Sequence, residues 1–277
     1  MRSGSMNAFV GELIGTAILI LFGCGVNANV NLKGTYAKGS DWIVIAVGWG
    51  LAVVMGVYAV GSITGAHLNP AVTIGMAVDG SLPWNQVLPY FAGQMIGGVL
   101  GAALVWFQFM PHFKEEEDAG TKLGVFATGP AYPNYVSNFV SEIIGTSILV
   151  MALLFIGGNK FSEGLNPLVV GLLIIAIGVS LGGTTGYAIN PARDWGPRIA
   201  HTILPIPGKG SSNWKYAVVP MVGPMVGGVF GATLFHVLFK EDQYMLFGLS
   251  IVLIVATLVL GVFLNKAVLK NEKTDLI

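Results

Sequence analysis

Long apolar runs follow one another along almost the whole chain, with short polar connections between them. Seven of these runs approach the roughly 20 residues that a helix needs to cross a bilayer. They lie at about 8–26, 42–61, 86–107, 138–157, 165–183, 216–239 and 244–264. The pattern predicts an all-α, polytopic membrane protein.

The composition fits a protein whose solvent is mostly lipid. Only 10% of the 277 residues are charged and 54% are hydrophobic, whereas a soluble domain usually carries about 25% charged residues. The formal net charge is zero and no basic block is present, so we expect no nucleic-acid partner. The single cysteine, Cys24, and the four histidines show no metal-ligand spacing, and hydroxyls such as Thr16 and Ser141 show no His/Asp partner spacing. We therefore expect no metal, no cofactor and no enzymatic activity.

The sequence repeats itself, with halves at about 6–110 and 136–243. Three ordered matches carry the repeat: GELIGT (11–16) with SEIIGT (141–146), HLNPAV (67–72) with AINPAR (188–193), and AGQMIGGVLGAAL (92–104) with VGPMVGGVFGATL (222–234). Each half holds three apolar runs, and because three is odd the second half must cross the membrane with opposite polarity. In the third match, glycines recur at every fourth position, which predicts close helix–helix contacts.

Each half also carries an apolar segment that is interrupted by Gly and Pro, at 61–80 and at 182–200. Its helical part is too short to cross, and polar backbone at membrane depth is tolerated only where it is buried in protein or lines a watery cavity. Both segments contain an Asn-Pro-Ala tripeptide: Asn69, Pro70, Ala71 and Asn190, Pro191, Ala192. Proline suits the first position of a helix, so each asparagine is expected to cap a half-helix.

Inverted symmetry brings these two half-helices together, N-terminus to N-terminus, near the middle of the membrane. Each N-terminus carries about half a positive charge, which opposes protons and cations. The asparagine amides can donate hydrogen bonds to a passing oxygen, and the extended stretches before them leave carbonyls free to accept. The expected acceptors are the carbonyls of Gly65, Ala66, His67, Leu68, Gly186, Ala188 and Ile189.

The paired motifs GAHLNPAVT (65–73) and NPARDWGPR (190–198) resemble those of the aquaporin superfamily, and the resemblance covers about residues 8–240. It implies six tilted transmembrane helices plus two re-entrant half-helices, one pore in each subunit, and a homotetramer in the cell (plasma) membrane. It also implies a passive channel that conducts glycerol, water and similar small neutral solutes in single file and excludes ions and protons.

Particular positions are similar to the glycerol-conducting branch of that family: Asp194 directly after Arg193, and the pair Pro220 and Met221. The selectivity filter of the family falls here on Trp49, Gly178, Tyr187 and Arg193. Glycine at the second of these positions leaves room for a carbon backbone. Tyr187 stands where the family more often has Phe, and its hydroxyl is expected to make the filter more polar. Related channels of lactic acid bacteria pass undissociated lactic acid, which is therefore a further candidate solute.

Glu12 and Glu142 are intramembrane carboxylates at matching places in the repeat. They can be a proton relay, or they can accept hydrogen bonds from the loop backbones beside the half-helices, as the resemblance implies. Asp194 is expected to brace the extracellular loop near Arg193. The acidic run at 115–118 is expected to be a solvated loop.

The run at 244–264 lies beyond the six helices of the family, and it can be an extra transmembrane helix, a helix lying along the bundle or an appended segment. We assign residues 6–243 to the channel domain and 244–277 to an extra C-terminal apolar helix with a basic tail that includes Lys266, Lys270 and Lys273. Residues 1–5 are interpreted as a cloning remnant. The resemblance places the N-terminus inside the cell.

Two other functions remain open at this point. Inverted repeats with broken helices also build secondary transporters, so an ion- or proton-coupled carrier of a small organic acid or polyol is the main alternative. Such a carrier needs an ion site beside the substrate, and the sequence offers amides, carbonyls and one arginine instead. The second alternative is a structural membrane protein that no longer conducts, and the intact Asn69, Asn190 and Arg193 speak against it.

Overall fold

The computed structural model describes the backbone of residues 4–274 and the side chains of residues 6–268. Residues 1–3 of the expected remnant and the side chains of Lys270 and Lys273 lie outside this part. In chain order the helices are α1 (Gly4–Asn31), α2 (Trp42–Thr64), α3 (Pro70–Asp79), the 3₁₀ turn η1 (Trp84–Gln86), α4 (Val87–Gln108), α5 (Met110–Glu115), α6 (Ala119–Phe126), α7 (Tyr135–Gly157), α8 (Asn166–Leu181), α9 (Pro191–Ile203), α10 (Val218–Phe239) and α11 (Tyr244–Thr274). The described residues contain no strand, so the all-α prediction is confirmed.

Six of these helices are long and apolar enough to cross a membrane: α1, α2, α4 together with η1, α7, α10 and α11. The predicted run at 165–183 forms α8, which has only 16 residues. At 1.5 Å per residue it is about 24 Å long, which is shorter than the roughly 30 Å hydrocarbon core. Gly182 and Gly183 follow it, and the chain turns there into the second interrupted segment.

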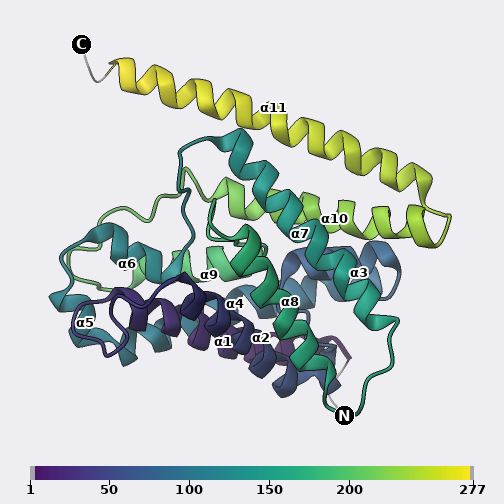
Figure 1. The fold of residues 1–277 in the computed structure, drawn as a ribbon, viewed down its shortest axis with the longest axis horizontal. Helices are drawn as coiled ribbons and strands as arrows, with labels where there is room; N and C mark the ends of the chain where they lie inside the picture. The colour runs from purple at the N-terminus through teal and green to yellow at the C-terminus, as the bar shows by residue number, and fades with distance from the viewer. Residues whose placement is uncertain (1–3, 275–277) are drawn as a thin grey trace.

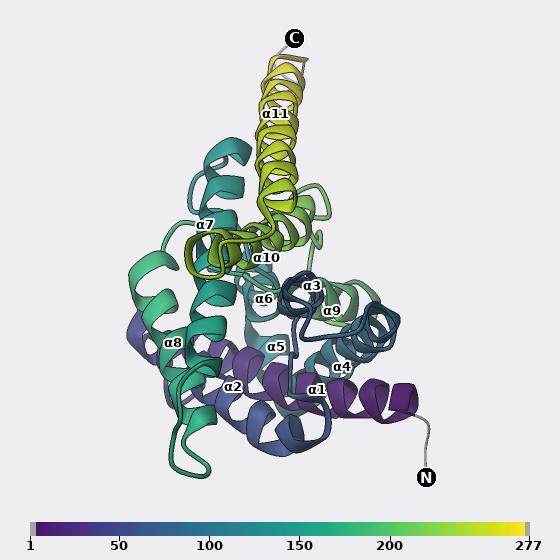
Figure 2. The ribbon, with the colours of Figure 1, turned by 90° about the vertical axis from the view of Figure 1, so that its right-hand side faces the viewer.

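The long helices lie side by side, with the two short helices α3 and α9 enclosed among them (Figures 1 and 2). The regularly spaced glycines make the predicted close contacts. A Cβ atom on Gly97 of α4 would lie 2.4 Å from the Leu13 carbonyl oxygen of α1, and one on Gly231 of α10 would lie 2.4 Å from the Ser147 carbonyl oxygen of α7. These separations are too short for any side chain, so glycine is required for both helix pairs to approach.

Each half-helix packs against the last long helix of the other repeat. A Cβ atom on Gly98 of α4 would lie 2.8 Å from the carbonyl oxygen of Ala192 in α9. The matching Gly228 of α10 would bring a Cβ atom to 2.4 Å from the carbonyl oxygen of Ala71 in α3. Because each half-helix packs against a helix of the other repeat, the two Asn-Pro-Ala motifs lie next to each other at the centre of the bundle.

Helix α11 runs back along the outside of α7 and α10 (yellow in Figure 1). Near its start, Gln243 Nε2 donates to the Val78 carbonyl oxygen at the end of α3, over 3.1 Å. Near its other end, Asn265 Oδ1 accepts from the backbone N–H of Tyr135 at 2.8 Å, at the start of α7. Because these contacts lie at opposite ends of the bundle, α11 follows the bundle along its whole length.

Candidate channel site

The half-helices α3 and α9 both begin at an asparagine that caps its own helix. Asn69 Oδ1 accepts from the backbone N–H of Ala71 at 2.8 Å, and Asn190 Oδ1 accepts from that of Ala192 at 3.0 Å. A proline occupies the first helical position in each case, where its missing N–H is not needed. Both side-chain oxygens are therefore used inside the helix, and only the amide nitrogens can act outside it.

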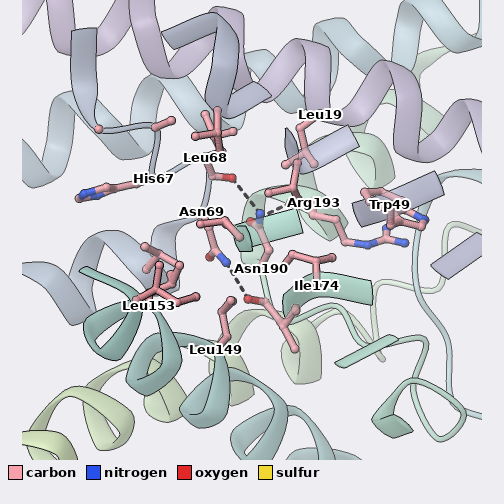
Figure 3. A pocket seen from close by; sticks show the side chains of 18 of the residues that line it. Leu19, Trp49, His67, Leu68, Asn69, Leu149, Leu153, Ile174, Asn190 and Arg193 are labelled. Atoms are coloured by element: carbon pink, nitrogen blue, oxygen red, sulfur yellow. Dashed lines mark hydrogen bonds between the residues drawn. The ribbon is translucent and has the colours of Figure 1, made fainter. Parts of the chain in front are cut away.

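The two amide nitrogens cross over to the opposite repeat (Figure 3). Asn69 Nδ2 donates to the carbonyl oxygen of Ile189, and Asn190 Nδ2 donates to that of Leu68, each over 2.8 Å. A primary amide has two N–H groups, so one N–H of each asparagine keeps no partner among residues 4–274. The reciprocal pair fixes the orientation of both amides and leaves one donor from each half for a third molecule.

Glu12 supports the first loop from behind. Its Oε1 accepts from Thr64 Oγ1 at 2.6 Å and from the backbone N–H of His67 at 3.0 Å. Its Oε2 accepts from the backbone N–H of Leu68 at 2.7 Å and from Gln94 Nε2 at 2.8 Å. With four donors around a fully buried carboxylate, this geometry favours the acceptor interpretation over the proton relay.

Glu142 supports the second loop in the same way. It accepts from Thr185 Oγ1 at 2.6 Å and from the backbone N–H groups of Ala188 and Ile189 at 2.9 and 2.7 Å. It is also buried. The two carboxylates thus bind backbone N–H groups of the loops, whereas the asparagine amides bind loop carbonyl oxygens.

The loops themselves take an unusual backbone path. Four non-glycine residues have left-handed φ angles: Ala66 (53°), Leu68 (53°), Tyr187 (37°) and Ile189 (40°). Such conformations persist only where surrounding contacts impose them, and the glutamates supply those contacts. With the N–H groups held, the carbonyls at 65–67 and 186–188 accept no hydrogen bond from residues 4–274. The carbonyls of Leu68 and Ile189, also expected as acceptors for solute, already accept from the asparagines.

A cavity of about 270 Å³ passes both asparagines. It extends from Trp49, Tyr187 and Arg193 to Gly157 and Asn166, at the loop between α7 and α8. Polar groups reach it from the two loops, which contribute residues 65–69 and 187–190. The rest of its lining is largely apolar and includes Leu19, Val53, Val57, Val72, Met76, Leu149, Leu153, Ile156, Val170 and Ile174. Figure 3 shows Leu149 and Leu153 beside Asn69. Gly178 and Gly186, which we expected at the pore, are not part of this lining.

Arg193 and Trp49 meet at one end of the cavity, where Figure 3 shows the guanidinium turned away from the asparagines. The Arg193 Cζ atom lies 3.9 Å from the centre of the Trp49 ring, and Arg193 Nη1 donates to the carbonyl oxygen of Phe126 at 3.2 Å. The indole N–H of Trp49 donates to Asn27 Oδ1 at 3.1 Å. Cation–π stacking and these bonds hold the guanidinium in place. Its remaining N–H groups have no protein acceptor within the described residues and can donate to a solute.

The Tyr187 hydroxyl does not behave as its sequence position suggested. It is enclosed by protein and has no hydrogen-bond partner among the described residues. The ring tips over Gly178, where a Cβ atom would lie 2.7 Å from Tyr187 Cζ and 2.8 Å from the hydroxyl oxygen. The absence of a side chain at Gly178 therefore makes room for the tyrosine. The expectation that this hydroxyl makes the filter more polar stays a prediction, because in this structure the hydroxyl oxygen is buried against Gly178.

Comparison with known proteins agrees with this geometry. The sequence profile of the major intrinsic protein family matches residues 1–235. The chain belongs to the major intrinsic protein family. It is similar to the glycerol uptake facilitator protein of Bacillus subtilis (strain 168), with 57% identity over 93% of this chain and 94% of the relative. It is also similar to the D/L-lactic acid transporter of Lactiplantibacillus plantarum, with 38% identity over 83% of this chain and 97% of the relative.

Among solved structures, the fold is similar to the X-ray structure of the aquaglyceroporin from Plasmodium falciparum. The TM-score is 0.76 at 30% identity, over 85% of this chain and 97% of that one. This major intrinsic protein is thus a multi-pass membrane protein. An alignment that covers 93% of the 277 residues extends beyond the 243 that precede α11, so the Bacillus relative shares part of the C-terminal segment.

Sequence reasoning expected Asp194 to brace the loop near Arg193 but missed Arg198, its buried partner in this major intrinsic protein. Asp194 accepts from Arg198 Nε at 2.7 Å and from the backbone N–H and hydroxyl of Thr128 at 2.7 and 2.6 Å. Arg198 also donates to the carbonyl oxygens of Thr128 and Ser212, at 2.9 and 2.8 Å. Neither charged side chain is exposed. The spacing in the sequence could have indicated this pair, because an Asp and an Arg four residues apart lie on one face of a helix.

The acidic run at 115–118, expected to be a solvated loop, is exposed at Glu115, Glu117 and Asp118 but not at Glu116. Glu116 is buried and accepts hydrogen bonds from the backbone N–H groups of Lys33, Glu117 and Asp118. Burial by itself would raise the pKa of the Glu116 carboxyl, but the N–H groups of Asp118, Glu117 and Lys33 together with the charge of Lys38 lower it below its usual value. This carboxylate organises the turn into α6, the helix that ends at the Arg193 contact, Phe126.

Proposed function

We propose that this protein is a passive channel through which glycerol and other small uncharged solutes cross the cell membrane in single file. The proposal rests chiefly on one observation. Each of the two asparagines donates one N–H to a loop carbonyl of the opposite repeat and keeps the other N–H, beside carbonyls without partners, in a cavity whose lining is largely apolar. A polyol can exchange its bound water for these donors and acceptors while its CH groups contact the apolar lining.

The same arrangement disfavours ions. Moving an ion out of water without full compensation costs far more than moving a hydroxyl group. The positive ends of α3 and α9 add a specific penalty for cations and protons. The buried carboxylates Glu12 and Glu142 are occupied by loop donors, which leaves them unsuited to carry a coupling ion. The coupled transporter is therefore the weaker interpretation.

The relatives support glycerol as the principal solute. The Bacillus protein is named as a glycerol uptake facilitator and is 57% identical, whereas the named lactic acid transporter is 38% identical. We extend the proposal to water, to undissociated lactic acid as a secondary solute, and to a homotetramer with one pore in each subunit.

The test is the rate of shrinkage and reswelling of proteoliposomes under a glycerol gradient, with and without imposed sodium and proton gradients. We expect glycerol flux to exceed that of empty liposomes and to stay unchanged when the ion gradients are reversed. The double variant Asn69→Ala, Asn190→Ala, reconstituted at equal amount, controls for leakage through the lipid. A flux that follows the ion gradients would instead establish a coupled transporter.

Lactic acid is tested in the same vesicles at a series of pH values. Uptake through the channel should be proportional to the concentration of the neutral acid and fall as the solution pH rises above the pKa of lactic acid. Uptake that follows the lactate anion would contradict the proposal for this solute.

A further inference from the structure

Trp42, the first residue of α2, lies outside the filter positions yet touches two of them. Its indole Nε1 donates to the carbonyl oxygen of Gly178 at 2.8 Å. Its ring meets the Tyr187 ring edge-on, with 5.8 Å between the centroids and 74° between the planes. Trp42 does not line the cavity, so any effect it has on a solute must pass through Tyr187.

The tyrosine ring lies in a slot that these residues define. A Cβ atom on Gly182 would lie 2.6 Å from Tyr187 Cδ1 and 2.7 Å from Trp42 Cζ2. Gly178 closes the slot beneath the phenol end of the ring, as described above. Two glycines and one indole therefore surround the ring on the sides away from the cavity.

The ring needs this external support, because its own contacts do not fix it. The Tyr187 hydroxyl has no hydrogen-bond partner among residues 4–274. Glu142 holds the N–H groups of the next two residues, Ala188 and Ile189, and so supports the left-handed backbone of Tyr187 but not its ring. The indole N–H of Trp42 makes a directional bond to the floor of the slot, and its ring edge closes one side.

We propose that Trp42 is a positioning residue of the selectivity filter, which fixes how far the Tyr187 ring projects into the channel and so sets the largest polyol that passes. The proposal rests on the channel function proposed above. Without the indole, the ring can retreat toward the space that Trp42 occupied, and the opening widens. The indole N–H and the ring edge contribute separately, since one fixes the α8 backbone and the other contacts the tyrosine.

The experiment compares the permeability of proteoliposomes to erythritol and to glycerol, expressed as a ratio. For Trp42→Leu we expect this ratio to rise about three- to tenfold. For Trp42→Phe, which keeps an aromatic edge but loses the N–H, we expect a rise of about twofold. A change in the amount of folded protein scales both permeabilities equally and leaves the ratio unchanged, so the ratio separates positioning from stability.

Trp195→Leu is the matched control. Trp195 also donates its indole N–H to a carbonyl oxygen, that of Ala217 at 2.7 Å, and also meets another ring edge-on, that of Trp214 at 5.3 Å. It does not line the cavity, so its replacement should leave the ratio unchanged. An unchanged ratio in Trp42→Leu, or an equal rise in both leucine variants, would overturn the proposal. If the unsubstituted protein passed no glycerol, the channel function itself would fail instead.

Discussion

The half-helices α3 and α9 begin alike and then differ in charge. Both start with an asparagine cap and a proline, and both have a glutamate behind the preceding loop. Counted from the Asn-Pro-Ala motif, Arg193, Asp194 and Arg198 of α9 stand where α3 has Val72, Thr73 and Ala77. All three charged side chains are buried.

This difference separates two tasks within the channel. The symmetric parts, which are asparagine amides and loop carbonyls, come from both repeats and replace the water shell of a solute. Arg193, Asp194 and Arg198 have no charged counterparts in the first repeat; we propose that Arg193 contributes to the filter, and the Asp194–Arg198 pair holds the loop at Thr128. Burying a charged pair costs desolvation free energy. We therefore interpret the Asp194–Arg198 pair as a part of the structure that the filter requires.

The largest effect is expected from breaking the buried pair in α9. Arg198→Met leaves the Asp194 carboxylate buried without its cation, and removing one partner of such a pair typically costs about 3–5 kcal/mol. At the α3 position that matches Asp194, Thr73→Val should cost about 1–3 kcal/mol, because it removes neutral hydrogen bonds. The thermal midpoint of the detergent-solubilised protein measures both. If Arg198→Met and Thr73→Val lowered the midpoint equally, the buried charges of α9 would contribute no more to stability than the neutral residues of α3.

The two supporting glutamates should respond unequally. Glu142→Gln turns an acceptor into an amide that faces N–H or O–H donors, and we expect a loss of about 2–3 kcal/mol. Glu12→Gln should cost less, because Gln94 can rotate its amide and present its oxygen, which now has no partner within the described residues. Pro224 occupies the position of Gln94 in the second repeat and offers no such adjustment.

Unfolding midpoints of both glutamine variants, alone and combined with Gln94→Leu, test this explanation. With leucine at position 94, Glu12→Gln should lose as much stability as Glu142→Gln does. The losses from Gln94→Leu and Glu142→Gln should simply add. If Gln94→Leu affects both variants equally, rotation of the Gln94 amide is not the cause.

Arg193→Val gives α9 the residue that α3 carries at this position. We expect the proton leak of proteoliposomes to rise about tenfold, which corresponds to about 1.4 kcal/mol, because a fixed positive charge is lost. Glycerol flux should fall less than this, since the asparagines and loop carbonyls remain. A pH-sensitive dye inside the vesicles reports the leak, and an unchanged leak would place cation exclusion entirely at the half-helix termini.

The smallest effect is expected from Tyr187→Phe. The hydroxyl is enclosed and has no partner among residues 4–274, so its removal should change the ratio of glycerol to water permeability by less than about twofold. A larger shift would show that the hydroxyl turns toward the solute during permeation.

Much of the fold followed from patterns that physics makes strict. Helix length in a bilayer, the odd number of spans in each repeat and the glycine spacing predicted the bundle and its inversion. The Asn-Pro motifs predicted both half-helices, because a proline at the first helical position after a capping residue has few other uses at membrane depth. The position of α11 along α7 and α10 was not predictable, because an apolar helix in lipid has no preferred neighbour until specific contacts such as that of Asn265 are known.

The site was predicted less completely than the fold. Residue identity indicated Tyr187 as a polar group, but the direction of its hydroxyl depends on the space left by Gly178, nine residues earlier and on another segment. The cross-bonding of the asparagines with Leu68 and Ile189 depends in the same way on two repeats meeting in register. Such relations are tertiary, and no local pattern in the sequence encodes them.

The most direct test of the central claim is an experimental structure of the protein saturated with glycerol. The free N–H groups of both asparagines should reach one solute oxygen, so we predict a glycerol oxygen within about 3.2 Å of both Asn69 Nδ2 and Asn190 Nδ2. Glycerol in the cavity that bypasses both amides, in a protein that still conducts, would contradict the account.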